Sequence, residues 1–192
     1  MRILADLSVI YDACVLYPAP LRDTLMSLAV TRLFQAHWTD AIHAEWIGNL
    51  RESRPDISME QLNRTRRVMD HAVPDALVGG YHGLVPTLNL PDPDDRHVLA
   101  AAIHAGAELI ITFNLKDFPV NILSGYGIEA RHPDDFVVHL LQEYSAEVLT
   151  ALRSQRQRLV RPPQSVEEFL DTLVRQGLLK TVDLLRSQSE LL

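Results

Sequence analysis

Residues 108–113, Glu-Leu-Ile-Ile-Thr-Phe, carry the strongest strand pattern in the chain. A short apolar, β-branched run between turn-forming residues predicts a strand buried on both faces. The helical pattern before it starts at Asp92-Pro93 and ends at Gly106, a residue typical of helix C-termini. A helix that leads directly into a buried strand is typical of a crossover connection in a parallel sheet.

Weaker strand patterns alternate with helical patterns through about residue 140. Strands are predicted at Ser8–Ala13, Ala36–Thr39, Val85–Leu90 and Ile128–Arg131. Helices are predicted at 21–34, from Asp40 to Leu50 with Asp40 as the cap, at 59–72 after a Ser58/Gln61 capping box, and in one stretch from Asp134 towards Val160. A Ser165/Glu168 capping box then opens a helix, and Leu178–Leu192 is also predicted as helical.

This alternation predicts an α/β fold with a central parallel sheet, followed by an all-helical C-terminal extension. We place the division near Glu143–Ser145, giving an α/β domain at 1–143 and a helical extension at 144–192. The length of 192 residues suits one domain with such an appendage, and 47% hydrophobic and 22% charged residues are ordinary for a globular protein.

Cysteine content and apolar patterning indicate the compartment. Cys14 is the one cysteine, so neither an intrachain disulfide nor a cysteine-based zinc site can form. Apolar runs fall well short of the roughly 18 residues of a membrane span, and Asp6 and Asp12 interrupt the N-terminal apolar stretch in a way that argues against a secretory signal. We therefore expect a cytoplasmic protein without membrane association.

The net charge of −7 argues against nucleic-acid binding through a broad basic face. It remains compatible with a nuclease, because a carboxylate cluster that holds metal makes a protein more acidic. Arg51, Arg54, Arg64, Arg66 and Arg67 could contact RNA, although a solvated helical face is the simpler interpretation.

Acidic residues recur where predicted strands end. Asp12 follows the first strand, Glu45 lies one turn into the helix after the second, Asp95 opens the helix before the strongest strand, and Asn114 and Asp117 follow that strand. The carboxyl ends of parallel strands form the functional crevice of open α/β sheets. Carboxylates that converge there repel one another unless a cation neutralises them, and oxygen ligands favour Mg²⁺ or Mn²⁺.

Each acid also has a purely structural interpretation. Asp12 could cap a loop, Glu45 could be a solvated helix acid, Asp95 could provide favourable charge at a helix N-terminus, and Asp117 could be a turn residue. The order of the motifs along the chain is more informative than any single residue.

Four segments in order resemble the PIN-domain nucleases, and among them the VapC-like toxins of toxin–antitoxin pairs. They are Tyr11-Asp12-Ala13-Cys14-Val15-Leu16-Tyr17-Pro18 with Leu21-Arg22-Asp23, Trp38-Thr39-Asp40-Ala41-Ile42-His43-Ala44-Glu45 with Asn49-Leu50, Asp92 to Ala102, and Ala107 to Pro119. The fold that this resemblance implies is the PIN-like α/β/α sandwich.

The resemblance implies that Asp12, Glu45 and Asp95 form an acidic site for Mg²⁺ or Mn²⁺. Asn114 stands where the family usually has a fourth acid, so Asp117 is expected to complete the cluster, and Thr112 or Asn114 to orient water or a phosphate oxygen. Asp6 offers a second register for the first motif. Asp12 is preferred because the match continues through Cys14 to Pro18.

The implied activity is metal-dependent hydrolysis of RNA phosphodiesters by a toxin, with RNA, a cognate antitoxin and a second copy of the chain as partners. The alternative is a catalytically silent PIN fold that binds RNA or protein, which the neutral Asn114 favours. A phosphatase or receiver-like domain is a third interpretation, but the first strand lacks the Asp-x-Asp-x-Thr run of the phosphatases.

Overall fold

The computed structural model describes residues 7–192 and contains one four-stranded parallel sheet. The strands are β1 (Ser8–Tyr11), β2 (Gln35–His37), β3 (Leu109–Ile111) and β4 (Glu129–Arg131), in the order β2-β1-β3-β4. Val9 pairs with both Ala36 and Leu109, and Leu109 pairs with Glu129. Because all strands run in parallel, their carboxyl ends share one edge, as the sequence predicted.

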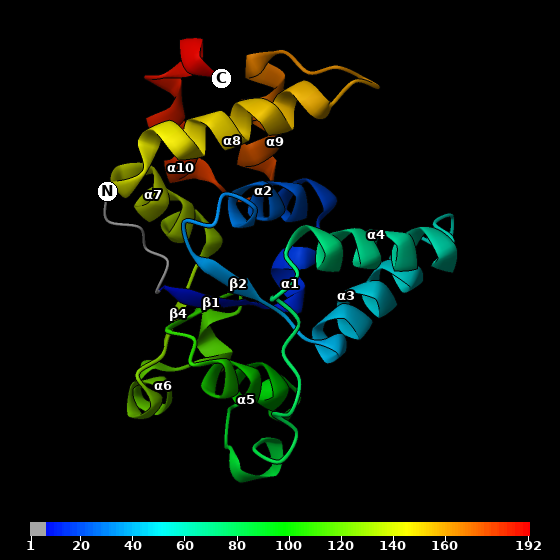
Figure 1. Cartoon of the computed structure of the whole chain (residues 1–192), viewed down its shortest axis with the longest axis vertical. Helices are drawn as coiled ribbons and strands as arrows, with labels where there is room; N and C mark the ends of the chain where they lie inside the picture. The colour runs from blue at the N-terminus through cyan, green and yellow to red at the C-terminus, as the bar shows by residue number, and fades with distance from the viewer. Residues whose placement is uncertain (1–6) are drawn as a thin grey trace.

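Helices cover both faces of this sheet, which confirms the PIN-like α/β/α class. In Figure 1, α2 and α7 lie over one face, α5 and α6 lie over the other, and α8–α10 form a further layer beyond α2 and α7. The helices are α1 (Ala13–Leu16), α2 (Ala19–Ala29), α3 (Asp40–Ser53), α4 (Met59–Ala72), α5 (Arg96–Ala105), α6 (Val120–Leu123), α7 (Pro133–Glu143), α8 (Ser145–Arg158), α9 (Val166–Arg175) and α10 (Leu179–Arg186).

Short 3-10 turns join several of these elements. They are η1 (Val85–Thr87), η2 (Pro93–Asp95), η3 (Leu115–Asp117), η4 (Ser124–Tyr126) and η5 (Ser189–Leu191). None of the helices within residues 7–192 combines the length and the apolar character required to cross a bilayer.

Three predicted helix ends are confirmed, one cap is wrong, and the helix predicted at 21–34 is α2, which ends at Ala29. Both capping boxes form, and Gly106 ends α5 in the left-handed conformation at φ 64°. The cap of α3, however, is Thr39, whose hydroxyl accepts from the Ile42 N–H at 3.0 Å. Asp40 instead accepts from the Arg66 guanidinium at 2.6 Å, because α4 packs beside α3 and brings that cation within reach.

Two other predictions are corrected. Residues 85–90 are not a strand: Val85–Thr87 is a 3-10 turn, and Pro86 within it lacks the N–H that a strand ladder needs. The predicted single helix from Asp134 is two helices, α7 and α8, separated by Tyr144 at φ −137° and ψ 48°. The break lets α8 fold back over α2, which apolar periodicity alone does not reveal.

Hydrogen bonds connect the C-terminal helices α10 and α8 to α7 and α2, respectively. Asp134 of α7 is 3% exposed and accepts from the Thr181 N–H at 2.9 Å, the Thr181 hydroxyl at 2.7 Å and the Lys180 N–H at 2.9 Å at the start of α10. The Gln155 amide of α8 donates to the Thr24 hydroxyl of α2 at 3.0 Å. The division between 1–143 and 144–192 stays a prediction, since side chains from both parts pack into one core.

Replacing Asp134 tests the importance of this cap. Asp134→Asn retains the shape but puts amide N–H groups opposite backbone N–H donors, so we expect the free energy of unfolding to fall by about 1–3 kcal/mol. Urea denaturation of the whole chain measures it. Asp135→Asn, which removes only the exposed pair with Lys180, is the matched control and should change stability little. Equal stability of the two variants would contradict the role of Asp134.

Candidate active site

Asp12 lies at the carboxyl end of β1 and is almost completely buried. Its Oδ1 accepts from the Ala13 N–H at 2.7 Å, and its Oδ2 accepts from the Thr112 hydroxyl at 2.7 Å. Thr112 directly follows β3, the neighbour of β1, so the sheet itself brings these two residues together. Burial raises the pKa of Asp12, the Thr112 and Cys14 hydrogen bonds oppose that rise, and the charge of Glu45 adds to it.

The Cys14 thiol is a further partner of Asp12 that sequence reasoning missed. Its Sγ donates to Asp12 Oδ2 at 3.2 Å and lies 3.3 Å from the Thr112 hydroxyl. Burial, followed by the charge of Asp12, raises the pKa of Cys14 to about 12. The group is therefore a thiol at neutral pH and can act as a hydrogen-bond donor to the carboxylate. Its place two residues after Asp12, in the first turn of α1, was the available signal.

Thr112 and Asn114 have structural roles at this edge. The Thr112 hydroxyl donates a hydrogen bond to Asp12 and accepts one from the Asn114 backbone N–H at 2.9 Å. The contact of Asn114 is thus made by its main chain and not by its side-chain amide. Their predicted role in orienting water or phosphate stays a prediction.

Asp95 lies at the junction of η2 and α5, where the negative charges of neighbouring carboxylates oppose its ionisation. Burial, and then the charges of Asp12, Asp92, Asp117 and Glu45 in that order, raise the pKa of Asp95 to about 7. Its buried Oδ2 has no hydrogen-bond partner within residues 7–192. The other three predicted acids, Asp12, Glu45 and Asp117, are therefore close enough to Asp95 to raise its pKa. The second register, with Asp6 as the first acid, lies outside the described residues.

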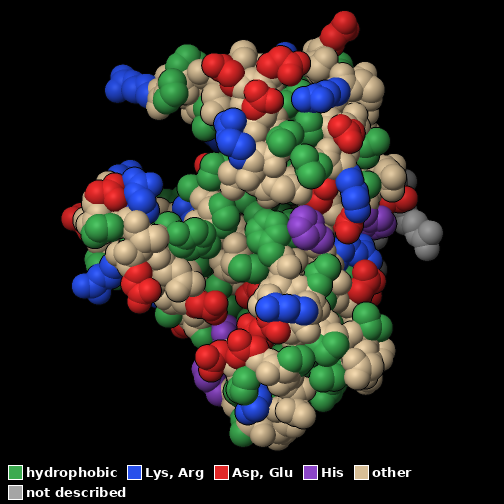
Figure 2. Space-filling view, turned by 180° about the vertical axis from the view of Figure 1, so that it is seen from behind, with side chains coloured by type: hydrophobic (Ala, Val, Ile, Leu, Met, Phe, Trp, Pro, Cys, Tyr) green, Lys and Arg blue, Asp and Glu red, His purple; other side chains and the backbone are tan. Residues whose placement is uncertain are grey.

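Glu45 is the most exposed of the four predicted acids, whereas Asp117 is half-buried. Glu45, on α3, has its Oε2 3.4 Å from the Nε2 of His97 on α5, an ion pair when the imidazole is protonated. This contact between α5 and α3 was not predicted from the sequence. Asp117 ends η3. Figure 2 shows acidic side chains gathered with histidines beside them, between the α3–α4 arm and the part of the molecule that contains α5.

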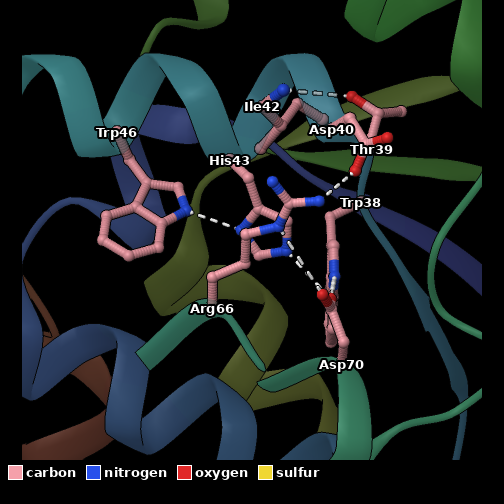
Figure 3. A network of polar contacts seen from close by, with 8 residues as sticks. All are labelled: Trp38, Thr39, Asp40, Ile42, His43, Trp46, Arg66 and Asp70. Carbon is pink, nitrogen blue, oxygen red and sulfur yellow. Dashed lines mark hydrogen bonds and ion pairs between the residues drawn. The ribbon is translucent and has the colours of Figure 1, made fainter. Parts of the chain in front are cut away.

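A buried polar network holds α3, and with it Glu45, in place (Figure 3). The Trp46 indole N–H donates to His43 Nδ1 at 2.9 Å, and His43 Nε2 lies 3.0 Å from Asp70 Oδ1 of α4. Because Nδ1 accepts, Nε2 must carry the proton and donate to Asp70. The Trp38 indole N–H donates to the same carboxylate oxygen at 2.8 Å, so α4, α3 and the end of β2 are tied together.

Several arginines and both tryptophans have structural roles. Trp38 and Trp46 are fully buried in the core. Arg22 is buried, donates to the Leu16 carbonyl at 2.6 Å, and lies 4.8 Å from the Trp46 ring centre. Of the arginines considered for RNA binding, Arg66 pairs with Asp40 on α3 and Arg54 pairs with Asp56.

The candidate ligands at this site are carboxylate oxygens of Asp12, Asp95 and Asp117. Within residues 7–192, no three His, Cys, Asp or Glu side chains are arranged as a metal site. Two observations nevertheless fit a cation: the unpartnered buried oxygen of Asp95, and the pKa of about 7 that neighbouring carboxylates impose on it. Carboxylate oxygens are the ligands that Mg²⁺ and Mn²⁺ prefer. The chemistry of the crevice thus suits such an ion, although the side chains do not form a finished coordination shell.

Comparison with known proteins agrees with this geometry. A PIN-domain family model matches residues 2–116, and a second family model, the VapC50 C-terminal domain, matches residues 133–187. Over 98 residues the chain is 39% identical to "Putative ribonuclease VapC50" of Mycobacterium tuberculosis (strain ATCC 25618 / H37Rv), covering 51% of this chain and 57% of the relative. The match thus spans a little over half of that relative's length. No solved structure matches. The chain belongs to the PIN-domain family.

Proposed function

We propose that this chain is an endoribonuclease that depends on Mg²⁺ or Mn²⁺ and acts in the cytoplasm as the VapC-like toxin of a toxin–antitoxin pair. The observation that carries the proposal is the convergence of Asp12, Glu45 and Asp117 on Asp95, whose pKa rises to about 7. Stored repulsion of this kind is typical of functional sites and is relieved by a cation. The PIN-domain match and the similarity to a named ribonuclease support the same activity.

In the proposed mechanism, Asp12 and Asp95 hold the cation and Asp117 completes the set. The ion, when bound, neutralises charge that develops on the scissile phosphate and favours ionisation of the attacking water. The Thr112 hydroxyl, the Cys14 thiol and the Ala13 N–H fix the orientation of the Asp12 carboxylate. Glu45 is the candidate general base, accepting the water proton on a carboxylate oxygen, and His97 holds that side chain towards the crevice.

The proposed partners are RNA, a cognate antitoxin that covers the acidic crevice, and a second copy of the chain. The resemblance to VapC proteins and the match of α7–α10 to the VapC50 C-terminal domain support them. Arg156 and Arg158, near the end of α8, are poor candidates for RNA contact because both are engaged within the protein. Arg158 donates to Ser27 at 2.8 Å, and Arg156 donates to the Gln164 and Leu192 carbonyls, both at 3.0 Å.

A catalytically silent PIN fold that binds RNA or protein is the second candidate. It is favoured by the neutral Asn114 at the usual position of the fourth acid, and by the lack of a three-ligand arrangement within residues 7–192. RNA binding without cleavage across several divalent ions would support it.

Substituting Asp95 distinguishes the two candidates. Asp95→Asn removes the most strongly perturbed carboxylate and should lower divalent-dependent RNA cleavage by at least about 100-fold, because the cation loses a ligand. Gel analysis of RNA with Mg²⁺, Mn²⁺ or excess EDTA measures it.

Asp94→Asn is the matched control, since Asp94 is an exposed neighbour of Asp95 on the same turn, and it should retain activity. Cleavage by Asp95→Asn at the wild-type rate, or wild-type cleavage that persists in EDTA, would rule out the proposed mechanism.

The raised pKa of Asp95 also predicts a pH-dependent stability. Between its ordinary pKa near 3.8 and the folded value of about 7, the folded protein binds more protons than the unfolded chain. The contribution of Asp95 to stability is therefore lost as pH rises through this window.

In EDTA, the Tm of Asp95→Asn relative to wild type should thus rise by several degrees, up to about 10 °C, between pH 5 and pH 8. Adding Mn²⁺ at pH 8 should raise the Tm of wild type but not of the variant. A difference in Tm between the two proteins that is the same at both pH values would contradict the electrostatic account.

A further inference from the structure

An open hollow of about 580 Å³ adjoins the acidic crevice and is lined by Cys14, Tyr17, Asn49, Glu52 and Ser53. The helices α1 and α3, which pack against each other, supply these residues (Figure 1). Cys14 is shared between the two places, because its Sγ lies 3.2 Å from Asp12 Oδ2. The hollow therefore begins one side chain away from the proposed catalytic acids.

The spacing along α3 continues from the crevice into this hollow. Glu45, Asn49 and Glu52 are separated by four and three residues, so they share one face of the helix. At 1.5 Å per residue, Glu52 lies about 10 Å along the axis from Glu45. A nucleotide next to the cleaved phosphate can reach this distance, so the hollow is in position to contact substrate RNA.

The two hydroxyls of the hollow are hydrogen-bonded within the protein, whereas two other side chains have no such partner among residues 7–192. The Tyr17 and Ser53 hydroxyls lie 2.8 Å apart, and the Ser53 hydroxyl donates to the Asn49 carbonyl at 2.9 Å, so both hydroxyls already have partners within the protein. The Asn49 amide and the Glu52 carboxylate are exposed, and neither has a hydrogen bond or ion pair to any residue in 7–192. These two side chains are free to bind a ligand.

The charge of the side chains that line the hollow favours contact with RNA bases over contact with the sugar-phosphate backbone. No lysine or arginine lines the hollow, and the Glu52 carboxylate repels phosphate, so the sugar-phosphate backbone is disfavoured. A carboxylate offers only acceptors. Unpaired bases present donors on their Watson–Crick edges, and guanine has two adjacent ones, the N1–H and the N2 amino group, which match the two oxygens of one carboxylate.

We propose that this hollow binds a guanine base of single-stranded RNA next to the scissile phosphate, and that Glu52 determines the preference. Glu52 accepts from guanine N1–H and N2–H, and the Asn49 amide is placed to donate to O6. The inference deepens the proposed ribonuclease function and rests on it. Uracil, cytosine and adenine each lack the pair of adjacent donors, so they bind less well.

Cleavage of a randomised single-stranded RNA pool, followed by sequencing of the new ends, tests the proposal. Wild type should favour guanine by about tenfold at one position flanking the cut, within the range of a good bidentate contact. Glu52→Gln should reduce that preference below about twofold, because cleavage next to guanine falls relative to cleavage next to the other bases. Glu143→Gln, which changes an exposed glutamate on α7, is the matched control and should keep the preference.

A binding measurement separates this inference from the catalytic proposal. Fluorescence anisotropy with Asp95→Asn and short labelled RNAs should show tighter binding to guanine than to adenine at one position, with inosine, which lacks the N2 amino group, in between. Adding Glu52→Gln should abolish the difference. Guanine preference lost with Glu52→Gln, even without cleavage, supports the hollow and contradicts only the catalytic role.

Two results would overturn the inference. Wild-type cleavage with a base preference that Glu52→Gln leaves unchanged would reject the hollow while the ribonuclease function stands. If the wild-type protein cleaves no RNA and the Asp95→Asn variant binds none, both the guanine site and the ribonuclease function are contradicted.

Discussion

Repulsion between carboxylates at the carboxyl edge of the sheet is the constraint on which the functional part of this molecule depends. Burial and four neighbouring acids keep the pKa of Asp95 at about 7, and one buried oxygen of Asp95 has no partner in residues 7–192. Groups of like charge are brought together at a cost in stability. A chain that keeps them there has an arrangement suited to a divalent cation and to the phosphate chemistry that such a cation assists.

The surrounding structure restrains the acids individually. Asp12 is held by the Thr112 hydroxyl, the Cys14 thiol and the Ala13 N–H, all supplied by β1, α1 and the end of β3. Glu45 is restrained in two other ways. The His43–Asp70 contact ties its helix, α3, to α4, and the Glu45 carboxylate itself contacts His97 on α5. The first acid is therefore rigid and buried, whereas Glu45 is partly exposed and can exchange a proton with solvent. This difference agrees with their separate proposed roles in holding a cation and accepting a proton.

The sheet and the convergence of the acids could be predicted because both follow from local patterns. Apolar runs identify the strands, and parallel strands place Asp12 and the residues after β3 at one edge. Contacts between distant segments could not be predicted. Thr39 replaces Asp40 as the cap of α3 because Arg66 of α4 attracts Asp40, and the helix after Asp134 breaks at Tyr144 without a glycine or proline to mark it. The pairing of His97 with Glu45 and the contact of Cys14 with Asp12 also depend on neighbours that only folding brings together.

The account is tested most directly by isothermal titration calorimetry of the metal-free protein with Mn²⁺ at pH 7, in buffers of different ionisation enthalpy. A protonated Asp95 must lose its proton when a cation binds, so the account predicts binding with release of about half a proton per ion at a pH equal to its pKa. Asp95→Asn should bind Mn²⁺ at least about tenfold more weakly and release no proton. Absence of Mn²⁺ binding to wild type, or equal affinity and proton release in the two proteins, would contradict it.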